Sequence, residues 1–98
     1  MAKIRWTEES LRWLEDIHGY IAQDNPNAAQ RVVAGIYEKV QVLKDFPEIG
    51  YVYREDNDAV VPVVIYGHYR IAYSLHTNDV VTILGVFHSA LDISKYNL

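Results

Sequence analysis

Two stretches of helical periodicity, separated by a short break, occupy the first half of the chain. In the first stretch, apolar residues recur at helical spacing, which predicts a helix over about residues 8–22. In the second, seven apolar positions form one stripe: Ala28, Ala29, Val32, Val33, Ile36, Val40 and Leu43. This stripe predicts a helix that ends near Asp45, ahead of Phe46-Pro47, because the residue before a proline avoids the α conformation.

The residues that precede each stretch are typical helix N-caps. Thr7 is followed by Glu8 and Glu9, whose carboxylates favour the positive end of a helix. Asn25 is followed by Pro26, whose missing N–H would have no partner at the first helical position anyway. The break between the helices is short, so the two should pack antiparallel as a helical hairpin.

Period-2 alternation and short apolar runs predict strands in the rest of the chain. Residues 2–6 alternate between apolar and charged and indicate a short strand before the first helix. Three strands are predicted after the helices, at about residues 60–66, 69–75 and 80–87. Residues 48–58 are predicted to form a loop, and residues 89–98 to hold one weak helical turn. Pro62 cannot donate a ladder hydrogen bond, so its strand should lie at a sheet edge or carry a bulge there.

The order of these elements, β-α-α-β-β-β, predicts an α+β fold, a helical hairpin packed on a small twisted antiparallel sheet. We expect a single domain spanning residues 1–98. Half of the residues are hydrophobic and 22% are charged, which is typical of a globular protein rather than a disordered one. The chain has no cysteine, which excludes disulfides and thiolate metal sites.

The register of the last hairpin decides which side chains share a face of the sheet. With Leu75 opposite Val81 and Ala72 opposite Leu84, one face is apolar and should lie under the helices. The side chains of that face are Tyr69, Ile71, Tyr73, Leu75, Val81, Ile83 and Phe87.

The same register predicts the contents of the opposite face. Arg70 would lie across from Val86, and His68 and His88 would be cross-strand neighbours one step away. Arg70 and His88 are therefore expected on one face of the sheet. His76 would share this face, but no further ligand has a spacing that indicates a metal site with these histidines.

Net charge limits the classes of partner. The chain carries −4 at neutral pH, with a sequence pI near 5.4 and only nine scattered Lys and Arg residues. Proteins that grip a phosphate backbone usually present a basic face, so direct nucleic-acid binding is disfavoured, except through a local patch around Arg54 and Arg70. The N-terminus lacks the apolar core of a signal peptide, and no window is long enough for a membrane span. We expect a soluble, cytoplasmic protein.

Four fragments follow one another in the order of known motifs: residues 20–29 (YIAQDNPNAA), 43–50 (LKDFPEIG), 69–73 (YRIAY) and 81–88 (VTILGVFH). The first two resemble the hairpin junction and the end of the second helix in ParE-type toxins. The last two resemble the "YRIxY" strand and the last strand of the RelE/ParE superfamily of type II toxins. The chain is therefore similar, over nearly its whole length, to the ParE-like, plasmid-stabilisation-system toxins of this superfamily.

This resemblance implies a protein that inhibits growth when it is free and that is wrapped by a cognate antitoxin from the same operon. ParE-like members poison DNA gyrase, whereas RelE-like members cut mRNA inside the ribosome. No cofactor and no metal are expected for either activity. A homodimer in the absence of the antitoxin is left open.

The ribonuclease alternative has candidate catalytic residues. Arg70 and His88 match positions that RelE-like enzymes use, the arginine for the phosphate and the histidine as acid or base. Glu48 or Glu55 would be the general base. The bland alternative is that Arg70 is a solvated strand arginine or pairs with one of these glutamates, and that His88 ends its strand.

Other features favour a non-catalytic, ParE-like toxin. Ser89 stands where several active ribonucleases of the superfamily carry tyrosine, and Leu91 stands where many members, ParE-like ones included, carry arginine. An acidic protein would also enter the ribosome against an unfavourable field. We therefore expect a gyrase poison whose functional surface includes Arg54, Arg70, Tyr73 and His88. The two alternatives are a ribosome-dependent ribonuclease and an inactive antitoxin-binding module.

The antitoxin is expected to cover exposed apolar surface with a helix or a strand. The expected places are the groove beside the helical hairpin and the edge of the meander, since an edge strand offers unpaired backbone groups. Trp6 and Trp13 are expected in the core or in the packing of the hairpin, and charged helix residues such as Asp16 are expected on solvated faces.

Overall fold

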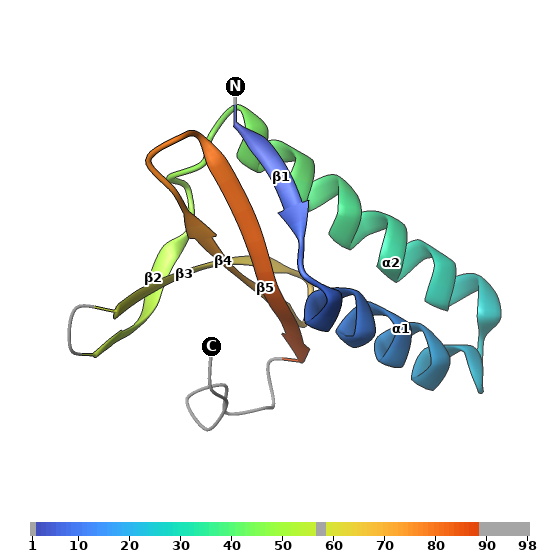
Figure 1. The fold of residues 1–98 in the computed structure, drawn as a ribbon. Coiled ribbons are helices and arrows are strands. Elements are labelled where there is room, and N and C mark those ends of the chain that lie inside the picture. The colour runs from blue at the N-terminus through green and yellow to red at the C-terminus, as the bar shows by residue number, and fades with distance from the viewer. Residues whose placement is uncertain (1, 57–58, 89–98) are drawn as a thin grey trace.

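The computed structural model describes residues 2–56 and 59–88, with side chains described outside residues 51–60. The elements in chain order are β1 (Lys3–Trp6), α1 (Glu8–Ala22), α2 (Pro26–Gln41), the short 3-10 helix η1 (Val42–Lys44), β2 (Tyr51–Asp56), β3 (Ala59–Tyr66), β4 (Tyr69–Leu75) and β5 (Val80–His88). This confirms the predicted α+β order, with one additional strand, β2 (Figure 1). The helical turn predicted within residues 89–98 lies outside the described residues.

Both helices begin at the predicted caps. The Thr7 hydroxyl accepts a hydrogen bond from the Ser10 N–H at 3.0 Å and donates one to the Ile83 carbonyl at 3.0 Å, which ties the start of α1 to β5. The side-chain oxygen of Asn25 accepts the Ala28 N–H at 3.0 Å. In the described part of the chain, neither helix has the length and apolar character that crossing a membrane would require.

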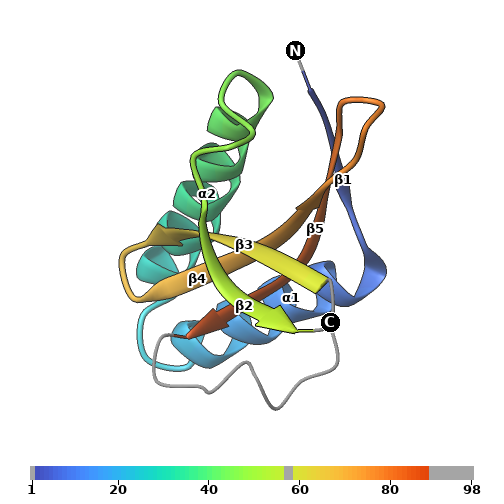
Figure 2. The same cartoon turned by 90° about the vertical axis from the view of Figure 1, so that its left-hand side faces the viewer.

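The five strands form one sheet in the order β1-β5-β4-β3-β2, and α1 and α2 both lie on one side of it (Figure 1, Figure 2). Strands β2 to β5 form an antiparallel meander. Strand β1, however, pairs in parallel with β5, with Lys3 opposite Val80 and Trp6 opposite Ile83. The sheet is therefore mixed, not wholly antiparallel as predicted. Parallel pairing needs a long connection, which the chain between these two strands supplies.

The segment predicted as a loop contains β2, which pairs with β3 at the edge of the sheet. Val52 lies opposite Pro62 and Arg54 lies opposite Val61, so the register shifts at Tyr53. A bulge thus lies next to Pro62, although its extra residue, Tyr53, belongs to β2 and not to the strand of Pro62. Strand β3 is not an edge strand, but Pro62 lies outside its pairing with β4. The loop prediction was wrong because an edge strand can carry charged residues where an inner strand cannot.

Apolar side chains are buried on both faces of the sheet. The larger cluster lies under the helices and joins Ile36 and Val40 of α2 to residues of β4 and β5. A smaller cluster, on the other face, comprises the buried residues Val61, Val63, Ala72 and Phe87. The apolar stripe of α1 is only partly buried, since Leu11 is 45% exposed. Part of the predicted core of the hairpin therefore faces outward.

Candidate functional site

Strands β4 and β5 carry most of the candidate site residues, and their register differs from the predicted one. Near the turn the pairing is as predicted, but Ala72 lies opposite Gly85 because the register shifts at Leu84. This bulge directly follows Ile83, the last residue of β5 that pairs with β1. Each residue of β5 beyond the bulge is displaced by one position relative to β4.

Because of this displacement, the residues of β5 after Leu84 point to the opposite faces of the sheet from those predicted. Phe87 lies opposite Arg70 and belongs to the smaller cluster, and its ring contacts that of Trp13 of α1, with centroids 4.6 Å apart. Glycine at position 85 leaves room for its ring, since a Cβ there would lie 2.7 Å from the ring atoms. Val86 and His88 turn to the helix side instead. Two predictions are therefore wrong: Phe87 does not share a face with Tyr69, Ile71 and Tyr73, and Arg70 and His88 do not share a face.

His88 lies at the end of β5 beside two other rings. It is opposite Tyr69, with ring centroids 5.5 Å apart and ring planes nearly perpendicular, at 88°. The ring of His68 lies 6.1 Å from that of His88. The two histidines are thus neighbours, as predicted, although His88 pairs with Tyr69 across the strands. The contact with Tyr69 places His88 on the side of the sheet away from Arg70.

Tyr73 is a buried anchor. Its side chain is 1% exposed, and its hydroxyl donates to the Pro47 carbonyl at 2.8 Å and accepts the Gly50 N–H at 3.1 Å. Burial raises the pKa of Tyr73, the hydrogen bond from Gly50 lowers it, and the charge of Glu48 raises it further. The expectation that Tyr73 belongs to an exposed functional surface is wrong, because the ring fills the core under the helices and the hydroxyl holds the loop before β2.

The other candidates occupy different parts of the sheet and its loops. Glu48 is exposed in the loop between η1 and β2. Glu55 and Arg54 belong to β2, and the directions of their side chains lie outside what the structure describes. Arg70 is half-buried, on the face away from the helices. The sheet therefore separates Arg70 and His88, the two side chains that were expected to act on one phosphate.

A small polar group lies near the β4–β5 turn. Nε2 of His76 is 3.2 Å from the Ser74 hydroxyl and 3.1 Å from the Thr82 hydroxyl. A serine activated for nucleophilic attack also needs its base oriented by a third group, and no hydrogen bond to the second ring nitrogen of His76 is recorded among the described residues. Over these residues, no three His, Asp, Glu or Cys side chains gather closely enough to hold a metal ion.

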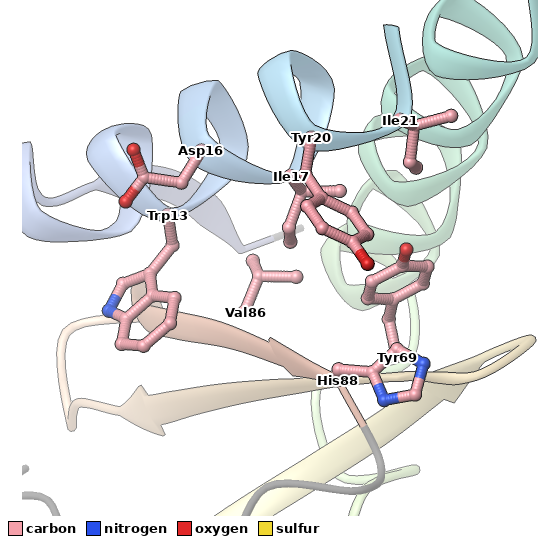
Figure 3. A pocket seen from close by; sticks show the side chains of 8 residues that line it. All are labelled: Trp13, Asp16, Ile17, Tyr20, Ile21, Tyr69, Val86 and His88. Carbon is pink, nitrogen blue, oxygen red and sulfur yellow. The ribbon is translucent and has the colours of Figure 1, made fainter. Parts of the chain in front are cut away.

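A groove of about 550 Å³ lies between α1 and the helix-side surface of β4 and β5 (Figure 3). Its lining residues are Trp13, Asp16, Ile17, Tyr20, Ile21, Tyr69, Val86 and His88. Ile17 and Val86 lie in the middle of the groove, with Trp13 on one side and the two tyrosines on the other. Tyr20 is 77% exposed. Burial, followed by the nearby Tyr20, raises the pKa of Tyr69.

The sequence predicted a groove beside the helical hairpin, but not which residues would line it. Trp13, Asp16 and Tyr20 are separated by three and four positions, which places them along one face of α1. That spacing indicated a shared helix face, but the sequence alone did not show which part of the sheet lies beneath this face.

A second apolar groove follows the outer side of the helical hairpin, between α1 and α2. It is lined in part by Leu11, Leu14, Val33 and Tyr37, and the side chain of Tyr37 is 54% exposed. Trp6 stacks on Tyr37, with ring centroids 6.3 Å apart and ring planes 11° apart. This contact extends the apolar surface to β1 at the edge of the sheet.

Comparison with known proteins identifies the family. Residues 4–93 match the family described as the ParE toxin of the type II toxin-antitoxin system, parDE. The chain belongs to the ParE toxin family. The match extends over every helix and strand of the described fold, so the resemblance drawn from four short motifs is confirmed.

The relatives of this ParE-family chain agree with that assignment. It is 48% identical over 48 residues to "Putative toxin Y4kP" of Sinorhizobium fredii, a match that covers 49% of this chain and 50% of that protein. The chain thus spans about half the length of that curated relative.

Two solved structures share the fold. The first is a chain of the chromosomal ParDE toxin–antitoxin system from P. aeruginosa, with a TM-score of 0.71, 20% identity, and coverage of 90% of this chain and 96% of that one. The second is a chain of the toxin–antitoxin complex RelBE2 from Mycobacterium tuberculosis, with a TM-score of 0.68, 24% identity, and coverage of 89% and 96%. At these identities the likeness shows the toxin fold alone.

Proposed function

We propose that this ParE-family chain inhibits growth by acting on DNA gyrase in the cytoplasm and is neutralised by a cognate antitoxin. The family match over residues 4–93 supports the role of toxin. The two neighbours in fold, each from a toxin–antitoxin system, support an antitoxin partner.

The placement of Arg70 and His88 on opposite faces of the sheet is the observation that favours gyrase over mRNA as the target. Cleavage next to a ribose 2′-OH needs a cation at the phosphate and an acid or base at the same phosphodiester. Arg70 lies on the face with Phe87, whereas the ring of His88 contacts Tyr69 on the helix side. This placement argues against both side chains acting on one phosphate and so disfavours the ribonuclease alternative.

A gyrase poison of this kind acts by binding, without chemistry of its own. Arg54 and Arg70 remain our candidates for the contact with gyrase, since both are basic residues on an otherwise acidic chain with a net charge of −4. Loss of either arginine should weaken toxicity, while His88 should be dispensable for it.

Induced expression of the toxin with two parallel readouts tests this proposal. Gyrase-linked DNA breaks and DNA-damage signalling should appear, Arg70→Ala should reduce both, and His88→Ala should leave both unchanged. Arg31→Ala, at an exposed position on α2, is the matched control and should behave as wild type. Codon-dependent mRNA cuts that disappear in both Arg70→Ala and His88→Ala would instead establish the ribonuclease. Normal growth with a stably folded protein would leave an inactive antitoxin-binding module.

The outer groove between α1 and α2 is our proposed antitoxin site. An amphipathic helix of the antitoxin would cover Leu11 and Tyr37, which are large apolar or aromatic side chains left exposed on the hairpin. In the absence of the antitoxin, a second copy of this chain would cover the same surface in a homodimer.

Binding of the product of the adjacent reading frame, measured by calorimetry, tests this site. Leu11→Asp should weaken that binding by at least roughly tenfold, since it places a charge in an apolar contact. It should also shift the free toxin toward monomer in sedimentation. Arg31→Ala should change neither, and equal binding by Leu11→Asp would remove the outer groove as the antitoxin site.

A further inference from the structure

The groove between α1 and the sheet is lined by several aromatic rings and one carboxylate. Aromatic rings flank it on two sides, Trp13 on one and Tyr20 with Tyr69 on the other, and the carboxylate of Asp16 lies on the α1 side near Trp13 (Figure 3). Ring faces attract cations through their quadrupole, and a neighbouring carboxylate adds a formal charge to that attraction.

We propose that this groove binds a segment of a partner polypeptide through an arginine side chain. The apolar stem of the arginine would cover Ile17 and Val86 in the middle of the groove. Its planar guanidinium would lie on the Trp13 side, next to Asp16 and the indole ring, which also contacts Phe87 with ring centroids 4.6 Å apart. The ring of Tyr20, on the other side, would cover the neighbouring apolar part of the segment. Arginine fits better than lysine because a flat guanidinium can stack on an aromatic face and pair with a carboxylate at the same time. This site is separate from the outer groove and from Arg70, so it does not depend on gyrase being the target.

The fold places these residues together in two ways. On α1, spacings of three and four positions align Trp13, Asp16 and Tyr20 along one face. On β5, the bulge at Leu84 turns Val86 to the helix side, where it forms part of the groove. Without the bulge, Val86 would point to the other face and the groove would lose its middle.

Charge favours a basic occupant over an acidic one. Helix α1 carries four carboxylates, Glu8, Glu9, Glu15 and Asp16, against Arg12, which gives a net charge of −3 with His18 neutral (one minus four). Arg12 lies 3.9 Å from Glu8, one turn away along the helix. Of these carboxylates, Asp16 lines the groove and is exposed, whereas Glu15 lines the outer groove, so the charge of Asp16 is the one that favours a cation there.

The dimensions favour a polypeptide segment. A groove of about 550 Å³ is large enough for an arginine side chain and for apolar side chains on either side of it. Tyr20 is 77% exposed, and tyrosine at such a position is a residue type that often dominates binding energy once it is covered.

A titration followed by NMR tests the proposal with a defined probe, a blocked five-residue peptide that carries arginine between two leucines. The indole N–H signal of Trp13, assigned by comparison with Trp6→Phe, should shift and saturate. A peptide with citrulline in place of arginine keeps the shape and removes the charge, and should bind about fivefold more weakly, which corresponds to about 1 kcal/mol. Asp16→Asn should weaken binding of the arginine peptide but not of the citrulline peptide.

Two exposed tyrosines provide the matched variants. Tyr20→Ala should weaken binding of the arginine peptide by about fivefold, whereas Tyr37→Ala, in the outer groove, should not change it. Equal affinity for the arginine and citrulline peptides, or equal effects of the two tyrosine variants, would overturn the proposal.

Discussion

Replacement of Tyr73 by phenylalanine removes two hydrogen bonds and almost no volume. The ring is buried under the helices, and the hydroxyl bridges the Pro47 carbonyl, at 2.8 Å, and the Gly50 N–H, at 3.1 Å. Through these two hydrogen bonds the hydroxyl joins β4 to the loop that leads into β2. Tyr73→Phe therefore tests how much of the stability of the sheet depends on holding that loop.

The structure gives the size of the effect. A hydrogen bond inside a protein contributes about 0.5–1.5 kcal/mol, so two bonds correspond to about 1–3 kcal/mol. The loop residues Glu48 and Ile49 are exposed, so water can reach the Pro47 and Gly50 groups after a small movement. We expect a loss of about 1–2 kcal/mol in the free energy of unfolding, toward the lower part of that range. For a domain of this size that loss lowers the Tm by roughly 5–12 °C.

Alkaline pH gives a second measure of the same group. Burial raises the pKa of Tyr73 above the ordinary value of 10.0, so the unfolded chain loses this proton at lower pH than the folded protein does. The stability that the neutral phenol contributes is present below about pH 10 and is lost as the pH rises through the folded-state pKa. The free energy of unfolding should therefore fall above pH 10, and less steeply in Tyr73→Phe.

Urea denaturation, followed by circular dichroism, measures both effects. Tyr66→Phe is the matched control, because among the described residues no hydrogen bond to the Tyr66 hydroxyl is present. The reasoning is refuted if the two variants lose the same free energy, or if Tyr73→Phe has the same alkaline slope as wild type. Proteolysis should also become faster within residues 46–50 in Tyr73→Phe alone.

Three further predictions use the same denaturation assay. Thr7→Ala should cost about 2 kcal/mol and Asn25→Ala about 1 kcal/mol, because Thr7 also donates to the β5 backbone; equal costs would contradict this. Gly19→Ala should stabilise α1 by about 0.5–1 kcal/mol, since a Cβ there meets nothing within 4 Å, and any loss would contradict this. Gly35→Ala should cost about 1–3 kcal/mol because its Cβ would overlap the Tyr66 ring, and Tyr66→Leu in the same chain should recover part of that loss.

Local chemistry made the helical hairpin predictable. The caps at Thr7 and Asn25 form the expected bonds, and α2 passes into η1 near the predicted end. These features depend on residues within one or two turns of each other, which the sequence displays directly. The bulge beside Pro62 was predictable for the same reason, since a proline removes a known backbone donor.

Features that depend on distant pairing were not predictable. Strand β2 was not predicted because its charged residues are typical of a loop. They are compatible with a strand only at the edge of a sheet, and the position at the edge is a property of the whole fold. The parallel pairing of β1 joins the two ends of the described chain, and no local signal specifies it. The burial of Tyr73 under the helices agrees with the predicted face, but the loop partners of its hydroxyl lie more than twenty positions away in sequence.

The bulge at Leu84 underlies both functional proposals, the non-catalytic toxin and the arginine-binding groove. The bulge lies where the pairing of β5 with β1 ends and where α1 begins to cover β5. An extra residue at that point turns Phe87 to the face of the smaller cluster and turns Val86 and His88 to the helix side. The same exchange places Arg70 and His88 on opposite faces of the sheet, which disfavours the ribonuclease alternative, and it brings Val86 into the aromatic groove beside α1. A variant that lacks the extra residue, with Leu84 deleted, should therefore lose binding of the arginine peptide even if it remains folded.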